Sequence, residues 1–265
     1  MEKIYPHAIN LKEKKCKLIA CEVMFREICF LLSQTHNIID VTFERKGLHD
    51  AGKERMEEFL QAEINRADPD EYAFILLAYG LCNNGVCGLS AKIPIVLPRA
   101  HDCITLLLGS KERYKKYFDA NPGTYYKSSG WIERGANFLP QSGSVMNNPG
   151  LKSYEEYVEE YGEENAQYIV ETLGGWTKNY NKMTYIDISI IQTNGNAVYF
   201  GDSEKYRERT KQKAAECGWE FEEIKGDIRL LEKLISGDWN QDEFLIVPPD
   251  KKIISSYTDE IVSFE

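Results

Sequence analysis

Short apolar runs alternate along the first half of the chain with segments whose apolar residues have helical spacing. Four runs have the length of strands, and they cover residues 17–20, 38–43, 72–79 and 93–97. Residues 72–79 are apolar throughout, which is typical of a strand buried on both faces. Residues 26–33 have helical spacing, and so does the set Met56, Phe59, Leu60 and Ile64. This alternation predicts a parallel sheet flanked by helices.

The second half repeats the alternation after a long irregular segment. Strands are predicted at 184–191, 221–224 and 244–247, and helices at 203–217 and around Ile228, Leu231 and Ile235. The segment 121–150, rich in Gly, Pro, Ser and Asn, predicts a connecting loop. The expected fold class is α/β, with two Rossmann-like lobes of parallel sheet flanked by helices and a ligand crevice between them. Residues 1–120 would form the N-terminal lobe, 121–183 the connecting loop and helix, and 184–265 the C-terminal lobe.

Composition and charge narrow the class of partner. The chain has 265 residues, of which 43% are hydrophobic and 28% charged, as in an ordinary globular protein. Its net charge of −10 argues against nucleic acid and against an anionic membrane as partner, because both need a basic face. No run approaches the roughly 18 apolar residues of a membrane span, and the charged N-terminal segment lacks the apolar core of a signal peptide. We therefore expect a cytoplasmic protein.

The cysteines gather where predicted strands end. The chain has seven of them, and an odd number in a reducing compartment argues against a disulfide framework. Cys21 ends the first predicted strand, Cys82 follows the third, and Cys103 follows the fourth together with His101. The carboxyl ends of parallel strands share one edge of a sheet, so these side chains are expected to meet.

Thiol and imidazole groups at one edge predict a metal site. Cys21, Cys82, His101 and Cys103 are the candidate ligands, and His101 and Cys103 would point the same way if that piece is extended. Zinc accepts such mixed ligands and is the metal we expect, with an iron–sulfur cluster as the alternative. Asp102 could orient His101, and Arg99 could bind a substrate carboxylate.

The loop between the third strand and Gly88 would contact a bound cofactor. We assign Tyr79, Gly80 and Gly85 to that role, because glycines allow close backbone approach. The loop lacks the Lys-Ser/Thr ending of a phosphate-binding loop. Asn83, Asn84 and Gly85 instead predict a tight turn that aims Cys82 and Cys87 at one centre, although the role of Cys87 as a ligand stays open.

Two alternatives to a functional thiol site remain. Free cysteine is among the most buried residue types, so these thiols could be inert core residues. A regulatory disulfide between Cys82 and Cys87 is the other alternative. We interpret Cys16, Cys29 and Cys217 as structural.

Three sequence blocks resemble an uncharacterised family, domain of unknown function 1638. They are AYGLCNNGVCGL, IPIVLPRAHDCITLLLGSKERY and NPGTYYKSSGWIE, and the resemblance covers roughly residues 17–250. The resemblance implies cysteines after strands one, three and four, here Cys21, Cys82 and Cys103, with His101 beside the last. Genes of this family often lie near corrinoid-dependent methyltransferases, which implies a link to one-carbon metabolism.

These observations predict a metal-binding small-molecule enzyme, with a corrinoid protein as a candidate partner in methyl transfer. His101 would be a ligand or general base, Asp102 its orienting residue and Arg99 an anion anchor. One alternative is a non-catalytic accessory protein that holds a metal, tetrapyrrole or corrinoid for a methyltransferase. Another is a metal-free enzyme with Cys103 as nucleophile and His101 close by.

Overall fold

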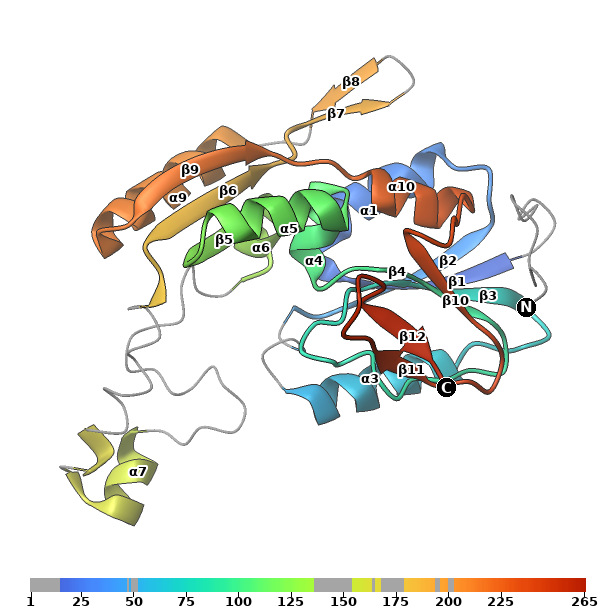
Figure 1. Cartoon of the computed structure of the whole chain (residues 1–265), viewed down its shortest axis with the longest axis horizontal. Helices are drawn as coiled ribbons and strands as arrows, with labels where there is room; N and C mark the ends of the chain where they lie inside the picture. Colours follow the sequence, from blue (N-terminus) through green and yellow to red (C-terminus); the bar gives the residue numbers. More distant parts are fainter. Residues whose placement is uncertain are drawn as a thin grey trace.

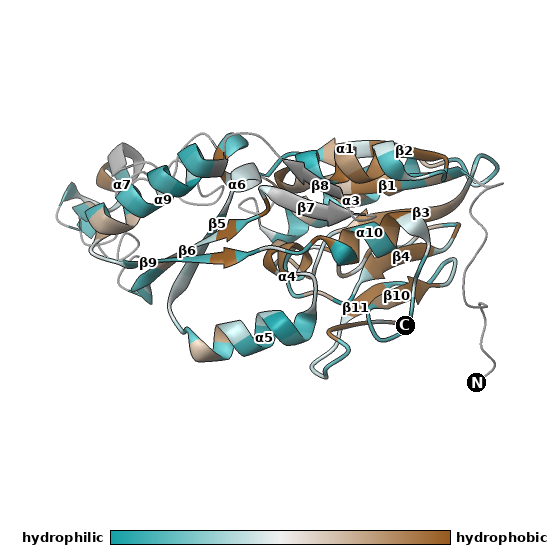
Figure 2. Cartoon of the chain, turned by 90° about the horizontal axis from the view of Figure 1, so that it is seen from above, coloured by the Kyte–Doolittle hydropathy of each residue, from teal (hydrophilic) through white to brown (hydrophobic). Residues whose placement is uncertain are grey.

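The computed structural model shows a mixed α/β protein whose larger sheets are flanked by helices (Figure 1). It describes residues 15–46, 48, 52–135, 154–163, 165–167, 179–193, 196–199 and 203–265. Apolar residues concentrate in the first sheet, whereas α5 (Lys111–Ala120) and α9 (Ser203–Cys217) are mostly hydrophilic (Figure 2).

The first sheet positions the candidate residues. Within the described residues it has five strands in the order β10-β4-β3-β1-β2. They are β1 (Lys15–Cys21), β2 (Ile39–Glu44), β3 (Tyr72–Ala78), β4 (Ile95–Pro98) and β10 (Phe244–Val247). The strands β2, β1, β3 and β4 are mutually parallel, so their carboxyl ends share one edge; β10 pairs antiparallel with β4.

Helices cover both faces of this sheet because its strands are apolar on both sides. One face packs against α1 (Phe25–Gln34), α4 (Cys103–Leu108) and α10 (Arg229–Ser236). The other face packs against α3 (Lys53–Asn65) and a C-terminal hairpin of β11 (Ile253–Ser255) and β12 (Val262–Phe264). A short 3-10 helix, η2 (Glu22–Met24), links β1 to α1.

A second, smaller sheet is wholly parallel among the residues described. It has the order β5-β6-β9, from β5 (Thr124–Ser128), β6 (Lys182–Asp187) and β9 (Glu220–Lys225). The helices α6 (Ser129–Glu133) and α9 lie beside it, while β7 (Ile190–Thr193) and β8 (Asn196–Tyr199) form a separate hairpin (Figure 1). The helix α7 (Tyr154–Tyr161) lies in the predicted connecting segment.

The two sheets are not built from consecutive lobes. The segment 244–247, which the sequence groups with the C-terminal lobe, is an edge strand of the first sheet, and β5 from the predicted connection belongs to the second. Ile186 and Ile188 at the end of β6 are buried in the same apolar cluster as α4. The backbone N–H of Asp227 also donates to Leu107 C=O at 2.8 Å. The sheets therefore share a core.

Part of the predicted loop at 121–150 is regular structure. Residues 124–133 form β5 and α6, and Ser128 begins α6 as its N-cap, with its hydroxyl accepting from the Trp131 N–H. Residues 136–150 lie outside the described part. No helix in the described ranges is long and apolar enough to cross a membrane.

Candidate functional site

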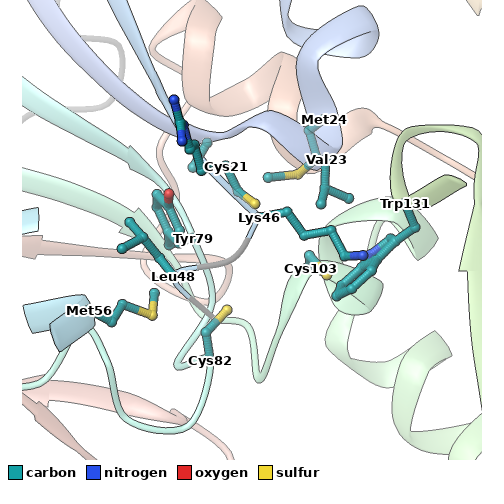
Figure 3. A pocket seen from close by; sticks show the side chains of 12 residues that line it. Cys21, Val23, Met24, Lys46, Leu48, Met56, Tyr79, Cys82, Cys103 and Trp131 are labelled. Carbon is teal, nitrogen blue, oxygen red and sulfur yellow. The ribbon is translucent and has the colours of Figure 1, made fainter. Parts of the chain in front are cut away.

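Three of the predicted cysteines line one pocket at the carboxyl edge of the first sheet (Figure 3). Cys21 is the last residue of β1, Cys82 lies four residues after β3 ends, and Cys103 is the first residue of α4, which follows β4. The parallel arrangement of these strands brings the three loops together. Cys82 and Cys103 are 8% and 9% exposed, and Cys21 is half-buried.

Backbone pairing holds the two later loops against each other. The N–H groups of Leu81 and Cys82 donate to the carbonyls of Ala100 and His101 at 2.9 and 3.0 Å. Gly80 permits this contact, because a Cβ there would lie 2.5 Å from the backbone nitrogen of Asp102. The close approach places Cys82 beside the start of α4 and hence beside Cys103.

Cys82 begins a left-handed turn. Cys82, Asn83 and Asn84 have φ values of 44°, 58° and 62°. Asparagine tolerates this region, whereas for cysteine it costs about 1 kcal/mol. Backbone strain of this kind is typical of functional sites, where the surrounding structure holds it in place.

The opposite wall of the pocket comes from η2, α6 and the segment after β2. Gly130 packs directly on the Val23 carbonyl, which brings its neighbour Trp131 to the pocket. The Lys46 side chain runs toward Trp131, and its Nζ lies 4.6 Å from the ring centroid (Figure 3). The Lys46 backbone N–H donates to Glu22 Oε1 at 2.9 Å, which fixes the base of that side chain.

The interior of the pocket is small and largely apolar. The space inside its lining, including space open to solvent, is about 380 Å³. Besides the three cysteines and Tyr79, the lining residues include Val23, Met24, Leu48, Met56, Ala78 and Trp131. A small apolar or sulfur-containing molecule matches this lining.

Burial keeps the three thiols protonated in the protein as it stands. It raises the pKa of Cys21 to about 11 and that of Cys82 to about 12, and the carboxylate of Asp102 adds to the effect at Cys82. Burial and the Asp102 charge likewise raise the pKa of Cys103 well above its usual value. Since the thiolate is the nucleophile and the metal ligand, none of these thiols is activated by its surroundings alone.

The three thiols have the donor chemistry for a soft metal ion, but their side chains are not arranged as ligands. Among the described residues, no three His, Cys, Asp or Glu side chains form a group that could hold a metal ion. Binding by Cys21, Cys82 and Cys103 therefore requires rotation of these side chains toward a common centre.

His101 is not among the residues that line the thiol pocket. It is exposed, with its ring centroid 6.1 Å from that of Tyr114, whereas Cys103 is buried. His101 and Cys103 were expected to point the same way if that piece is extended; Asp102 between them is extended, but Cys103 begins α4 and is buried, whereas His101 is exposed.

Asp102 and Arg99 have structural contacts. Asp102 caps α4 by accepting from the Thr105 N–H at 3.0 Å, and its other oxygen accepts from the Tyr114 hydroxyl at 3.1 Å. Arg99 is 9% exposed, and its guanidinium donates to the carbonyls of Gln241, Glu260 and Val262 at 2.8, 3.0 and 2.6 Å. These contacts differ from the predicted roles of Asp102 in orienting His101 and of Arg99 in holding an anion.

The remaining loop residues divide between the pocket and the core. Tyr79 lines the pocket, whereas Gly85 packs against the Met56 side chain. Cys87 is outside the pocket lining, with its sulfur 3.9 Å from Asn84 Oδ1, so the turn does not aim it at the same centre as Cys82. Both cysteines are free thiols.

Sequence reasoning missed Lys46 and Trp131. Lys46 lies two residues after β2, whose carboxyl end shares the edge of the sheet with those of β1, β3 and β4, and this position was the available signal. Trp131 belongs to the second sheet region, so only the fold brings it to the first.

Alkylation of the native protein is expected to discriminate among the seven cysteines. Exposed Cys29 should react readily with iodoacetamide at pH 8, whereas Cys16, Cys82 and Cys103 should react on the order of 100-fold more slowly, because they are buried and protonated. Peptide mass spectrometry after timed quenching measures this, with urea-unfolded protein as the control. Equal rates at Cys82 and Cys29 would contradict the buried pocket.

Fold and site together define an α/β protein with a thiol-lined pocket at the carboxyl edge of a mostly parallel sheet. The chain matches the family described as Protein of unknown function (DUF1638) over residues 43–235, and it belongs to that family. No curated protein and no solved structure matches it.

Proposed function

We propose that this chain is a metal-dependent enzyme that acts on a small substrate, with the thiolates of Cys21, Cys82 and Cys103 as its metal ligands. The single observation that carries the proposal is that three cysteines from three separate strand ends line one pocket. Core packing gives no reason for three thiols to share a pocket, whereas zinc, iron and other soft ions are bound by such donors. Three protein ligands would also leave a coordination position for substrate.

The raised pKa values of these thiols argue against a metal-free cysteine nucleophile. A thiol with a pKa of about 12 is almost wholly protonated at neutral pH, and exposed His101 is not positioned as its base. A bound divalent ion would stabilise the thiolate form of its ligands and of a substrate thiol.

Methyl transfer to a small thiol is the reaction class we propose, with a corrinoid protein as candidate methyl donor. The methyl chemistry comes from the family resemblance, and the apolar, sulfur-lined pocket is compatible with it. In such a transfer the thiol releases its proton to solvent and its sulfur takes the methyl group. The donor retains the electron pair of the broken bond.

A carrier role for a corrinoid or tetrapyrrole within this pocket is less well supported. The lining surface is almost wholly apolar, so the polar side groups of a corrinoid or tetrapyrrole would lack partners here. A closed metal site without substrate access would still favour an accessory protein.

Metal content of protein purified without air tests the proposal. We expect about one zinc or iron per chain in the wild type and a loss of most of it in Cys82→Ser and in Cys103→Ser. Cys29→Ser and Cys217→Ser are the matched controls, because these residues lie on α1 and at the end of α9, outside the pocket lining. Circular dichroism would establish that all variants are folded. Full metal retention in folded Cys103→Ser would overturn the assignment.

A further inference from the structure

The hydroxyl of Tyr79 is a buried polar group inside the proposed site. Tyr79 is 4% exposed, and its hydroxyl oxygen has no hydrogen-bond partner among the residues that the structure describes. The residue lines the thiol pocket and is among the side chains that Figure 3 labels there. A buried hydroxyl left unpaired is unfavourable, and a phenylalanine ring would fill the same space without that cost.

The surroundings of this hydroxyl indicate what it could bind. Tyr79, Cys21 and Cys82 line the same pocket (Figure 3). A tyrosine hydroxyl is neutral at physiological pH, so Tyr79 is a hydrogen-bond donor there. Arg45 and Lys46 also line the pocket, so a neutral oxygen and a carboxylate both match this donor.

We infer that Tyr79 donates a hydrogen bond to an oxygen of the substrate, which makes the substrate a small thiol that also carries an oxygen-containing group. This inference rests on the proposed metal-thiolate function and specifies its substrate class. Tyr79 is then a ligand-binding residue that selects for the oxygen, while the three cysteines interact with the sulfur end through the metal ion.

Matched pairs of thiols test the inference. Cobalt(II)-loaded protein is titrated with 2-mercaptoethanol against 1-propanethiol, and with 3-mercapto-1-propanol against 1-butanethiol, while the visible spectrum of cobalt reports binding. Within each pair the hydroxyl replaces a methyl group at the same length. For each pair we compare the affinity of the hydroxyl thiol with that of the alkyl thiol. This affinity ratio should be about tenfold higher in the wild type than in Tyr79→Phe, at one or both chain lengths.

The control variant is Tyr72→Phe on the same strand. The Tyr72 hydroxyl donates to Asp40 Oδ2 at 2.7 Å, and Tyr72 is outside the pocket lining, so its removal should leave the affinity ratio unchanged. Tyr79→Phe should bind as much cobalt as the wild type.

The outcomes separate the two proposals. Normal cobalt binding with the same affinity ratio in wild type and Tyr79→Phe, at both lengths, would overturn the role of Tyr79 alone. Failure of the wild type to bind cobalt or zinc would overturn the metal site, and this inference with it.

Discussion

Arg99→Met is expected to lower the free energy of unfolding by about 4 kcal/mol, because it removes a buried cation whose donors serve three backbone carbonyls. Gln241 lies in the turn before β10, and Glu260 and Val262 lie at the start of β12. Arg99 therefore ties the C-terminal segment to the end of β4. Methionine fills similar space but leaves those carbonyls unpaired.

Urea unfolding followed by circular dichroism measures this loss. Arg99→Lys should fall between wild type and Arg99→Met, since an ammonium keeps the charge but not the planar fork of donors. Lys115→Ala is the control, because the Lys115–Asp119 pair is exposed and should contribute little. Unchanged stability in Arg99→Met would contradict the structural role and restore Arg99 as a candidate anion anchor.

The sequence predicted individual elements better than their partners. The helix at 203–217 and the strand at 244–247 have the predicted bounds, because each ends at a definite stop, Gly218 or Pro248. An apolar strand of four residues contains no signal for its neighbour. The antiparallel pairing of β10 with β4 depends on long-range contacts such as that between Phe244 and Pro98.

Helix α5 places its aromatic residues at the margin of the core. Tyr114 and Tyr117 are half-buried and contact Tyr126, whereas Phe118 is 50% exposed. In α3 the spacing predicted Phe59 on the inner face, but it is 47% exposed. The buried residues of α3 are Met56, Leu60, Glu63 and Ile64, and Phe59 lies beside them.

The sequence was sufficient to predict which cysteines meet at the candidate site, but not which other residues lie there. Parallel strands fix which loops meet, so the positions of Cys21, Cys82 and Cys103 after three strands were sufficient. The direction of His101 depends on where α4 begins. The contacts of Arg99 depend on residues 142 to 163 positions away in the chain.

Gly80→Ala is expected to destabilise the protein by about 3 kcal/mol and to weaken metal binding in the protein that still folds. The added Cβ would lie 2.5 Å from Asp102 N, 2.7 Å from Asp102 Cα and 2.9 Å from Ala100 O. All three are backbone atoms, so no side chain can move aside. The loops that follow β3 and β4 must therefore move apart, which breaks the hydrogen bond from Cys82 N–H to His101 C=O.

Gly218→Ala is the matched control for this prediction. Gly218 has a φ of 69°, and a Cβ added there would meet no atom within 4 Å. The alanine substitution should therefore lower the free energy of unfolding by about 1 kcal/mol, through backbone strain alone. Urea unfolding gives the stability of both variants, and zinc titration of the folded protein gives the affinity. If Gly80→Ala lost stability but bound zinc as tightly as Gly218→Ala, the contact between the two loops would not position the thiols. If it lost affinity well beyond Gly218→Ala, the backbone approach at Gly80 would be what sets Cys82 and Cys103 side by side.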